Sequence, residues 1–232
     1  MKEEEQQEYQ ERMGSPEMEH LQYLSEQKPD INNIKKIAKE TTTIQDRFIK
    51  MDRENIEAYT PRYAVDIILP YIPKDKVIWC PFSREEHNFV WYLRELGYTV
   101  YNTHFDPETG EGKDFLTYEP DFDFDIILDN PPFKCKTKFV KRAFELGKPF
   151  ALFLPFNSFG DNGIPNLFIE YNVEPQLLIP DKRTEFENQK QKGISFKTIY
   201  ICRDILPKQI IFTKIDKGFK NKLKTPYNYR NN

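Results

Sequence analysis

The residues best suited to chemistry are the tetrapeptide Asn130-Pro131-Pro132-Phe133, which follows an apolar run that begins at Asp125. The two prolines fix φ and remove two backbone donors, so the carbonyl oxygens stay available to a ligand. The Asn130 side chain and the Pro131 carbonyl can accept hydrogen bonds from an NH2 group. Phe133 offers a flat face on which a flipped-out base can stack. The segment indicates a site that holds an amino group; the alternative is a turn that only ends a strand.

An amino group held in this way can itself act as the nucleophile. Hydrogen bonds to both of its hydrogens draw the nitrogen away from planarity and localise its lone pair for attack on a sulfonium methyl group. Such a reaction needs no enzyme nucleophile, and catalysis is then mainly alignment and desolvation of two bound reactants.

Short apolar runs alternate with amphipathic stretches along the middle of the chain, which predicts an α/β fold. We expect a helix that Thr60 caps and Pro61 begins, and further helices that Gly97 and Gly147 close. Strands that alternate with helices imply a mostly parallel sheet covered on both faces. The expected strands are 77–80, 98–101, 125–128 and 150–154, and the expected later helices are 85–96 and 138–146.

The last part of the chain has a different pattern. Residues 176–179, 196–202 and 209–213 are three strand-like runs without a convincing helix between them, and 206–208 resembles a hairpin connection. Consecutive strands of this kind predict an antiparallel C-terminal edge on the parallel sheet.

Composition excludes several classes of protein. Charged residues make up 31% and aromatic residues 15% of the 232 residues, which is typical of a globular chain. The three cysteines are far apart and the three histidines are scattered, so we expect neither a disulfide framework nor a metal site. No apolar run reaches the roughly 20 residues that cross a bilayer. These features favour a cytoplasmic location.

Charge is distributed unevenly and suggests three regions. Residues 1–58, an expected helical or partly disordered extension, carry 9 basic and 14 acidic side chains. Residues 182–232 carry 13 basic and 4 acidic side chains and include a basic tail over 216–232. The basic end fits either a nucleic-acid contact or a solubilising tail, and the acidic arm could engage a protein partner. The domain that carries the chemistry is expected over 59–215.

Over about residues 59–215 the sequence resembles the Rossmann-like amino-group methyltransferases, whose fourth motif reads (Asp/Asn/Ser)-Pro-Pro-(Tyr/Phe/Trp). It looks most like the small adenine-N6 DNA methyltransferases of phages and mobile elements. The segments that carry the resemblance are Tyr59-Thr60-Pro61, Ile78-Trp79-Cys80-Pro81-Phe82, Gly112-Lys113-Asp114-Phe115 and the Asn-Pro-Pro-Phe segment.

This resemblance implies S-adenosylmethionine as cofactor and assigns residues to it. Tyr59, Thr60 and Pro61 match the segment that touches the methionine part, and Cys80, Pro81 and Phe82 occupy the first cofactor loop. Asp114 matches the acceptor for the adenine amine, Phe115 the residue that packs the adenine ring, and Asn130 borders the cofactor. Asp106 is expected to bind the ribose hydroxyls, with His104 as the second candidate. The alternative for these residues is an ordinary turn or core role.

The first cofactor loop departs from the family pattern. Most members have a glycine-rich loop there, whereas this chain has no glycine between Glu57 and Gly97. Some small phage-type relatives carry a similar Trp-Cys-Pro-Phe loop. A non-catalytic protein that uses the methyltransferase fold for binding therefore stays open as an alternative, as do RNA and protein-amide substrates.

Basic residues near the expected site could contact nucleic-acid phosphates, and DNA is the preferred partner over RNA. The alternative is that these residues are solvated surface charges. They are Lys134, Lys136, Lys138, Lys182, Arg183, Lys190 and Lys192.

Overall fold

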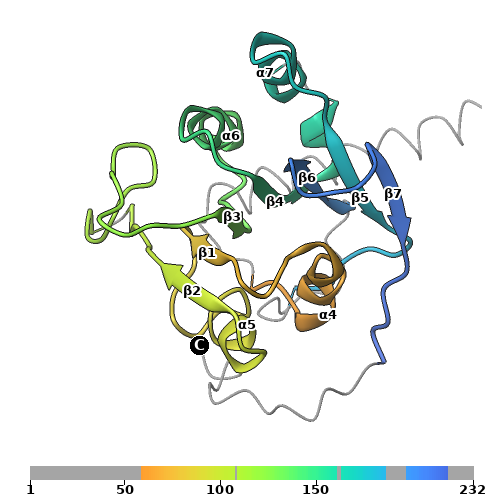
Figure 1. Cartoon of the computed structure of the whole chain (residues 1–232), viewed down its shortest axis with the longest axis horizontal. Helices are drawn as coiled ribbons and strands as arrows, with labels where there is room; N and C mark the ends of the chain where they lie inside the picture. The colour runs from red at the N-terminus through yellow and green to blue at the C-terminus, as the bar shows by residue number, and fades with distance from the viewer. Residues whose placement is uncertain (1–58, 108, 161–162, 187–196, 219–232) are drawn as a thin grey trace, which may run out of the picture. The chain divides into compact units, whose positions relative to one another are not determined.

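The computed structural model of the chain describes residues 59–107, 109–160, 163–186 and 197–218 (Figure 1). The chain divides into two units, Met1–Met51 and Asp52–Asn232, and every described residue belongs to the second. The expected extension over 1–58, most of the expected basic tail, and Lys190 and Lys192 lie outside the described residues.

The described part of the chain is built on a seven-stranded sheet with the order β2-β1-β3-β4-β6-β5-β7. The strands β1 to β4 are parallel, β6 is antiparallel to both β4 and β5, and β7 is parallel to β5. The expected mostly parallel sheet is thus confirmed, and its antiparallel strand, β6, comes from the C-terminal runs that were expected to supply it. The strands are β1 Val77–Cys80, β2 Thr99–Asn102, β3 Ile126–Asp129, β4 Phe150–Pro155, β5 Gln176–Pro180, β6 Thr198–Arg203 and β7 Ile210–Thr213.

Helices cover both faces of this sheet (Figure 1). One face packs against α6 (Lys136–Glu145) and α7 (Gly163–Glu170), whose apolar side chains join strand residues in one core cluster. The other face lies against α4 (Arg62–Asp66) and α5 (Trp91–Glu95), and the Tyr200 hydroxyl of β6 donates to the Ala64 carbonyl of α4 at 2.8 Å. Two short 3-10 turns complete the described elements, η1 (Leu69–Tyr71) and η2 (Phe156–Phe159).

The structure changes two sequence-based expectations about the helices and adds one helix that was not expected. The first helix begins at Arg62 with Pro61 as its N-cap, one residue later than expected, so Thr60 does not cap it. The helix expected over 85–96 is only α5, because the preceding residues form turns held by contacts such as the Asn88 side-chain amide on the Thr60 carbonyl. Helix α7 was not expected. The closing glycines are confirmed, since Gly97 and Gly147 both have positive φ.

The hairpin expected around 206–208 is wrong. β7 does not pair with β6 but crosses to the far side of β5, where its register aligns Leu177 with Ile210 and Ile179 with Phe212. The antiparallel strand β6 therefore lies inside the sheet, between β4 and β5.

Asp125 joins the starts of the two central strands. Its Oδ2 accepts from the Val77 backbone N–H at 2.9 Å, its own N–H donates to the Val77 carbonyl at 2.8 Å, and the Lys76 ammonium lies 3.6 Å from Oδ1. The Val77 hydrogen bond, with the Lys76 charge, holds the pKa of the Asp125 carboxyl below its usual value.

We expect Asp125→Asn to make the acid-side loss of stability shallower. A carboxyl whose folded pKa is depressed contributes stability above its unfolded pKa of about 4, and that contribution disappears as the pH falls through the folded pKa. Urea unfolding across this acid range measures the effect, and Asp123→Asn, at an exposed neighbouring position, is the control. A pH profile for Asp125→Asn that runs parallel to the wild type would contradict this role.

Candidate functional site

Two loops meet at the carboxyl edge of the central strands. The Asn130–Phe133 segment leaves β3, and the loop that begins at Pro81 leaves β1. Because β1 and β3 are parallel neighbours, with Ile78 opposite Ile126, their carboxyl ends lie side by side. This edge is where ligands bind in open α/β sheets.

One buried carboxylate links these two loops. Asp129, the last residue of β3, has no exposed surface. Its Oδ2 accepts from the Phe82 backbone N–H at 2.7 Å, and its Oδ1 accepts from the Ser83 hydroxyl at 2.6 Å and from the Asn130 backbone N–H at 2.8 Å. The glycine-free loop is therefore held by a side-chain acceptor from the neighbouring strand.

The protonation of Asp129 reflects two opposing effects. Burial raises the pKa of the Asp129 carboxyl, while the hydrogen bonds from Ser83, Phe82 and Asn130 act to lower that pKa. Each of the two Asp129 carboxyl oxygens accepts a hydrogen bond from a backbone N–H group, that of Phe82 or that of Asn130. Sequence reasoning missed this residue, although an acidic residue at the end of the run Ile126-Ile127-Leu128 was a signal for it.

The segment Tyr59-Thr60-Pro61 lies against the turn that continues from the β1 loop. The Thr60 carbonyl accepts from the Asn88 side-chain amide at 2.8 Å, and the Tyr59 ring meets the His87 ring edge-on at 4.7 Å. Thr60 and Pro61 are buried and Tyr59 is partly exposed. The structure thus brings this segment to the same region as the expected cofactor loop.

Aromatic rings pack behind the β1 loop. Phe82 is partly exposed, and its ring lies 4.9 Å from both Phe115 and Phe139, measured between ring centroids. Phe115 is 2% exposed and also packs 5.3 Å from Trp79. Phe115 and Trp79 are therefore core residues, and the expected contact of Phe115 with an adenine ring stays a prediction.

Cys80 is also part of the core. Its thiol is buried and donates to the Phe89 carbonyl, with 3.1 Å between sulfur and oxygen. Burial raises the pKa of this thiol well above its usual value, so the thiol stays protonated and is not a nucleophile.

The polar candidates for a cofactor follow β2. His104 Nδ1 lies 3.3 Å from the Phe82 carbonyl, so the β2 loop reaches the β1 loop. Arg84, which sequence reasoning also missed, donates from Nε to His104 Nε2 at 3.1 Å and has Nη2 4.0 Å from Asp106 Oδ2.

The second acidic candidate, Asp114, accepts from the Leu116 backbone N–H at 3.0 Å. Asp106 and Asp114 are both partly exposed, which leaves their carboxylates accessible to a ligand.

The Asn-Pro-Pro-Phe segment is partly open. Asn130 and Phe133 are partly exposed as whole residues, although the Oδ1 atom of Asn130 is buried. Pro131 is buried and Pro132 is exposed. The Phe133 ring meets Phe186 edge-on at 6.3 Å between centroids, so the segment after β5 lies beside it.

This contact bears on the basic residues that follow β5. The expected placement of 182–186 on the same side of the sheet as Asn130 is confirmed by the contact with Phe133. Lys182 donates to the Ile215 carbonyl at 3.3 Å, and Arg183 is exposed. On the other flank, Lys134 is exposed and Lys136 is the first residue of α6.

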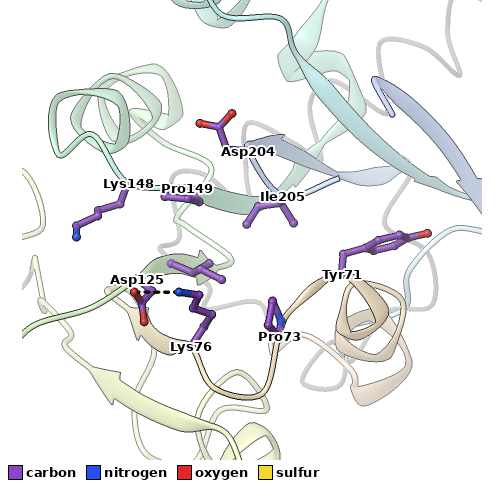
Figure 2. A pocket seen from close by; sticks show the side chains of 9 residues that line it. Tyr71, Pro73, Lys76, Asp125, Lys148, Pro149, Asp204 and Ile205 are labelled. Atoms are coloured by element: carbon purple, nitrogen blue, oxygen red, sulfur yellow. Dashed lines mark ion pairs between the residues drawn. The ribbon is translucent and has the colours of Figure 1, made fainter. Parts of the chain in front are cut away.

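A separate pocket of about 350 Å³ opens at the opposite edge of the sheet. Figure 2 shows Asp125 and Lys148, which precede β3 and β4, at its wall. None of the expected site residues lines this pocket. It is therefore distinct from the region around Asn130.

The described residues form neither a metal site nor a membrane-spanning helix. No group of three or more His, Cys, Asp or Glu side chains among them could hold a metal ion. In the same part of the chain, no helix has the length and apolar character to span a membrane.

Comparisons with known proteins support the fold. No protein-family model matches the sequence, and the search of curated proteins gives no match. Among solved structures, a chain from a study of complex assembly and conformational transition in the type I restriction-modification system superposes with a TM-score of 0.50 and 12% identity. That alignment covers 70% of this chain and 46% of the other.

Two further structures give weaker matches. A protein assigned as a modification subunit of a type I restriction enzyme from Vibrio vulnificus YJ016 has a TM-score of 0.42 at 12% identity, over 82% of this chain and 56% of that one. A protein from Listeria monocytogenes assigned as a class I S-adenosylmethionine-dependent methyltransferase has a TM-score of 0.43 at 13% identity, over 66% and 62%. This chain spans about half to three-fifths of these proteins.

The strand order and the first of these superpositions identify the fold. It is a Rossmann-like α/β fold, with parallel strands on both sides of β1 and an inserted antiparallel strand.

We expect Asp129→Asn to destabilise the protein by about 1–3 kcal/mol, because in any orientation the new NH2 group faces a buried donor. Ser83→Ala, which removes one of the three donors, should cost about 0.5–1.5 kcal/mol. Urea unfolding at neutral pH measures both. An Asp129→Asn protein as stable as the wild type would show that the linked loops do not depend on this carboxylate.

Proposed function

We propose that this chain transfers a methyl group from S-adenosylmethionine to an exocyclic amino nitrogen, and that the acceptor is adenine N6 in DNA. The observation that carries the proposal is the partly open Asn-Pro-Pro-Phe segment at the carboxyl edge of β3. A buried carboxylate, Asp129, fixes this segment to the loop that follows β1. A site for two reactants needs such a fixed separation, because the rate depends on their alignment.

The residues around the β1 and β2 loops suit the cofactor chemically. S-adenosylmethionine supplies an electrophilic methyl group on a sulfonium centre. Asp106 and Asp114 are partly exposed acceptors for ribose hydroxyls and an adenine amine, and Phe82 offers a partly exposed ring. Tyr59, Thr60 and Pro61 would border the methionine part. Because the Phe82 N–H already donates to Asp129, the methionine carboxylate must find its donors elsewhere.

The acceptor amine would be held by Asn130 and the Pro131 carbonyl. Two acceptors on one NH2 group orient its lone pair away from the base plane, toward the cofactor side of the site. The partly exposed ring of Phe133 would stack on the base, and its contact with Phe186 limits its movement. The chain then acts by positioning and by excluding water, and needs no nucleophile of its own.

DNA as the substrate is supported by the charges next to this site. Lys134 and Lys136 lie at the start of α6, whose first turn holds no acidic residue. Cations at a helix N-terminus are unfavourable for the helix dipole, and a phosphate there would interact well with both the lysines and the backbone N–H groups. Arg183 is exposed on the segment that contacts Phe133 through Phe186. The first of the solved structures reported above comes from a study of a type I restriction-modification system, which agrees with a DNA substrate.

One observation favours a second candidate, a non-catalytic protein that uses this fold for binding. The β1 loop lacks glycine, and the Phe82 N–H and the Ser83 hydroxyl are both engaged by Asp129. Within the enzyme class, RNA and protein amides are further candidate acceptors, since their NH2 groups fit the same hydrogen-bond acceptors.

We expect Asn130→Ala to lower methyl transfer to DNA by about 100-fold or more, as removal of one preorganised hydrogen-bonding group from an active site does. The assay uses labelled S-adenosylmethionine with DNA, RNA and protein acceptors in parallel. Asn166→Ala, at an exposed position on α7, is the matched control, and Cys80→Ala should retain activity. Transfer only to RNA or protein would reassign the substrate, and failure to bind S-adenosylmethionine in calorimetry would favour the non-catalytic protein.

We expect Lys134→Ala and Lys136→Ala each to reduce the salt dependence of DNA binding. Loss of one phosphate contact lowers the slope of log K against log salt by roughly 0.9. Fluorescence anisotropy with a DNA duplex at several salt concentrations measures this slope. Lys141→Ala, at an exposed position in the same helix, serves for comparison. Equal slopes for all three variants and the wild type would assign these lysines to the solvated surface.

A further inference from the structure

The strand β7 lies at the end of the sheet, next to β5 (Figure 1). It carries two of the large apolar side chains that are exposed in the described part of the chain. Ile210 is 55% exposed and Phe212 is 77% exposed. Scattered exposed apolar residues are common, but here two alternate residues of one edge strand are exposed together.

The register shows which face these side chains occupy. Ile210 aligns with Leu177 and Phe212 with Ile179, and aligned residues of parallel strands point to the same face of a sheet. Leu177 and Ile179 belong to the core cluster that α6 and α7 cover. The helical layer therefore shields β5 on this face and leaves β7 uncovered.

The backbone of the same two residues faces the open edge. Leu177 N–H donates to the Gln209 carbonyl and Asp181 N–H to the Thr213 carbonyl, so the odd-numbered residues of this segment direct their backbone groups toward β5. Since successive residues of a strand alternate, the N–H and C=O groups of Ile210 and Phe212 point away from β5. An added strand could thus pair with the backbone and cover the two side chains at once.

Charge discriminates between a second copy of the chain and a different partner. Exposed lysines, Lys208 and Lys214, flank β7 at its two ends. In an antiparallel pair of β7 strands that sets Ile210 against Phe212 of the copy, Lys208 faces Lys214 of the copy. Like charges directly opposite destabilise a strand pair, whereas carboxylates at these positions would stabilise it.

We propose that β7 binds an extended segment of a partner protein, with apolar residues at alternate positions and acidic residues at both ends. The segment adds an eighth strand to the sheet and buries Ile210 and Phe212. This surface is independent of the proposed methyl transfer, since β7 lies at the edge of the sheet and carries none of the proposed site residues.

The test is a selection of phage-displayed random dodecapeptides on the full chain. We expect the selected peptides to carry alternating apolar residues between Asp or Glu, and to bind Phe212→Ser at least tenfold more weakly than wild type. Tyr101→Ser, at an exposed position on the opposite edge strand β2, is the control that should bind normally. Methyl transfer should be unchanged in Phe212→Ser.

Two further measurements examine the geometry and the charges. N-methylation of every second residue of a selected peptide can be applied to either of two alternating sets of residues. It should abolish binding for one set and leave binding intact for the other, because only one set of N–H groups faces β7. The double variant Lys208→Glu/Lys214→Glu should prefer Lys-flanked peptides. Selected peptides without acidic residues, or binding that does not depend on Phe212, would overturn the proposal. Dimerisation of the wild type in sedimentation equilibrium that Phe212→Ser abolishes would overturn it in favour of a second copy.

Discussion

A single buried carboxylate determines how the two loops of the candidate site lie relative to each other. Asp129 has no exposed surface, and a charge in such a place is tolerated only when hydrogen bonds replace its lost hydration. The three donors come from both loops, so the need to satisfy this carboxylate fixes the loops together. Either loop could move only by leaving a buried oxygen or a buried N–H group without its hydrogen bond.

This constraint gives a physical account of the unusual β1 loop. A glycine-rich loop lets its own backbone approach a ligand closely. Here the backbone of Phe82 is instead held by a side chain from β3, and rings of Phe115 and Phe139 support the Phe82 ring from behind. Contacts with neighbouring side chains, rather than the backbone flexibility of glycine, thus determine the conformation of this loop. Any ligand in this region must use the exposed groups that remain, such as Asp106 and Asp114.

Much of the fold could be predicted because its central strands are continuous apolar runs. β1, β3 and β4 and the closing residues Gly97 and Gly147 have strong local signals. Helix α7 was missed because it is short and contains Pro165, which suggests a loop when the sequence is considered alone. The partner of β7 could not be predicted, since a short connection at 206–208 suits a hairpin and only tertiary packing places the strand beside β5. Asp129 was missed for a related reason, because its donors in the β1 loop are more than 40 residues away in sequence.

The position of β6 has a consequence for how the chain folds. β6 lies between β4 and β5, yet it is synthesised after both of them. Until residue 203 has emerged, one side of the fully buried strand β4 has no neighbour, and β5 has nothing to join it to the rest of the sheet. An apolar strand with an open edge readily pairs with other chains. Completion of the sheet thus depends on a late, long-range insertion, which makes the nascent chain most vulnerable to aggregation just before its last strands appear.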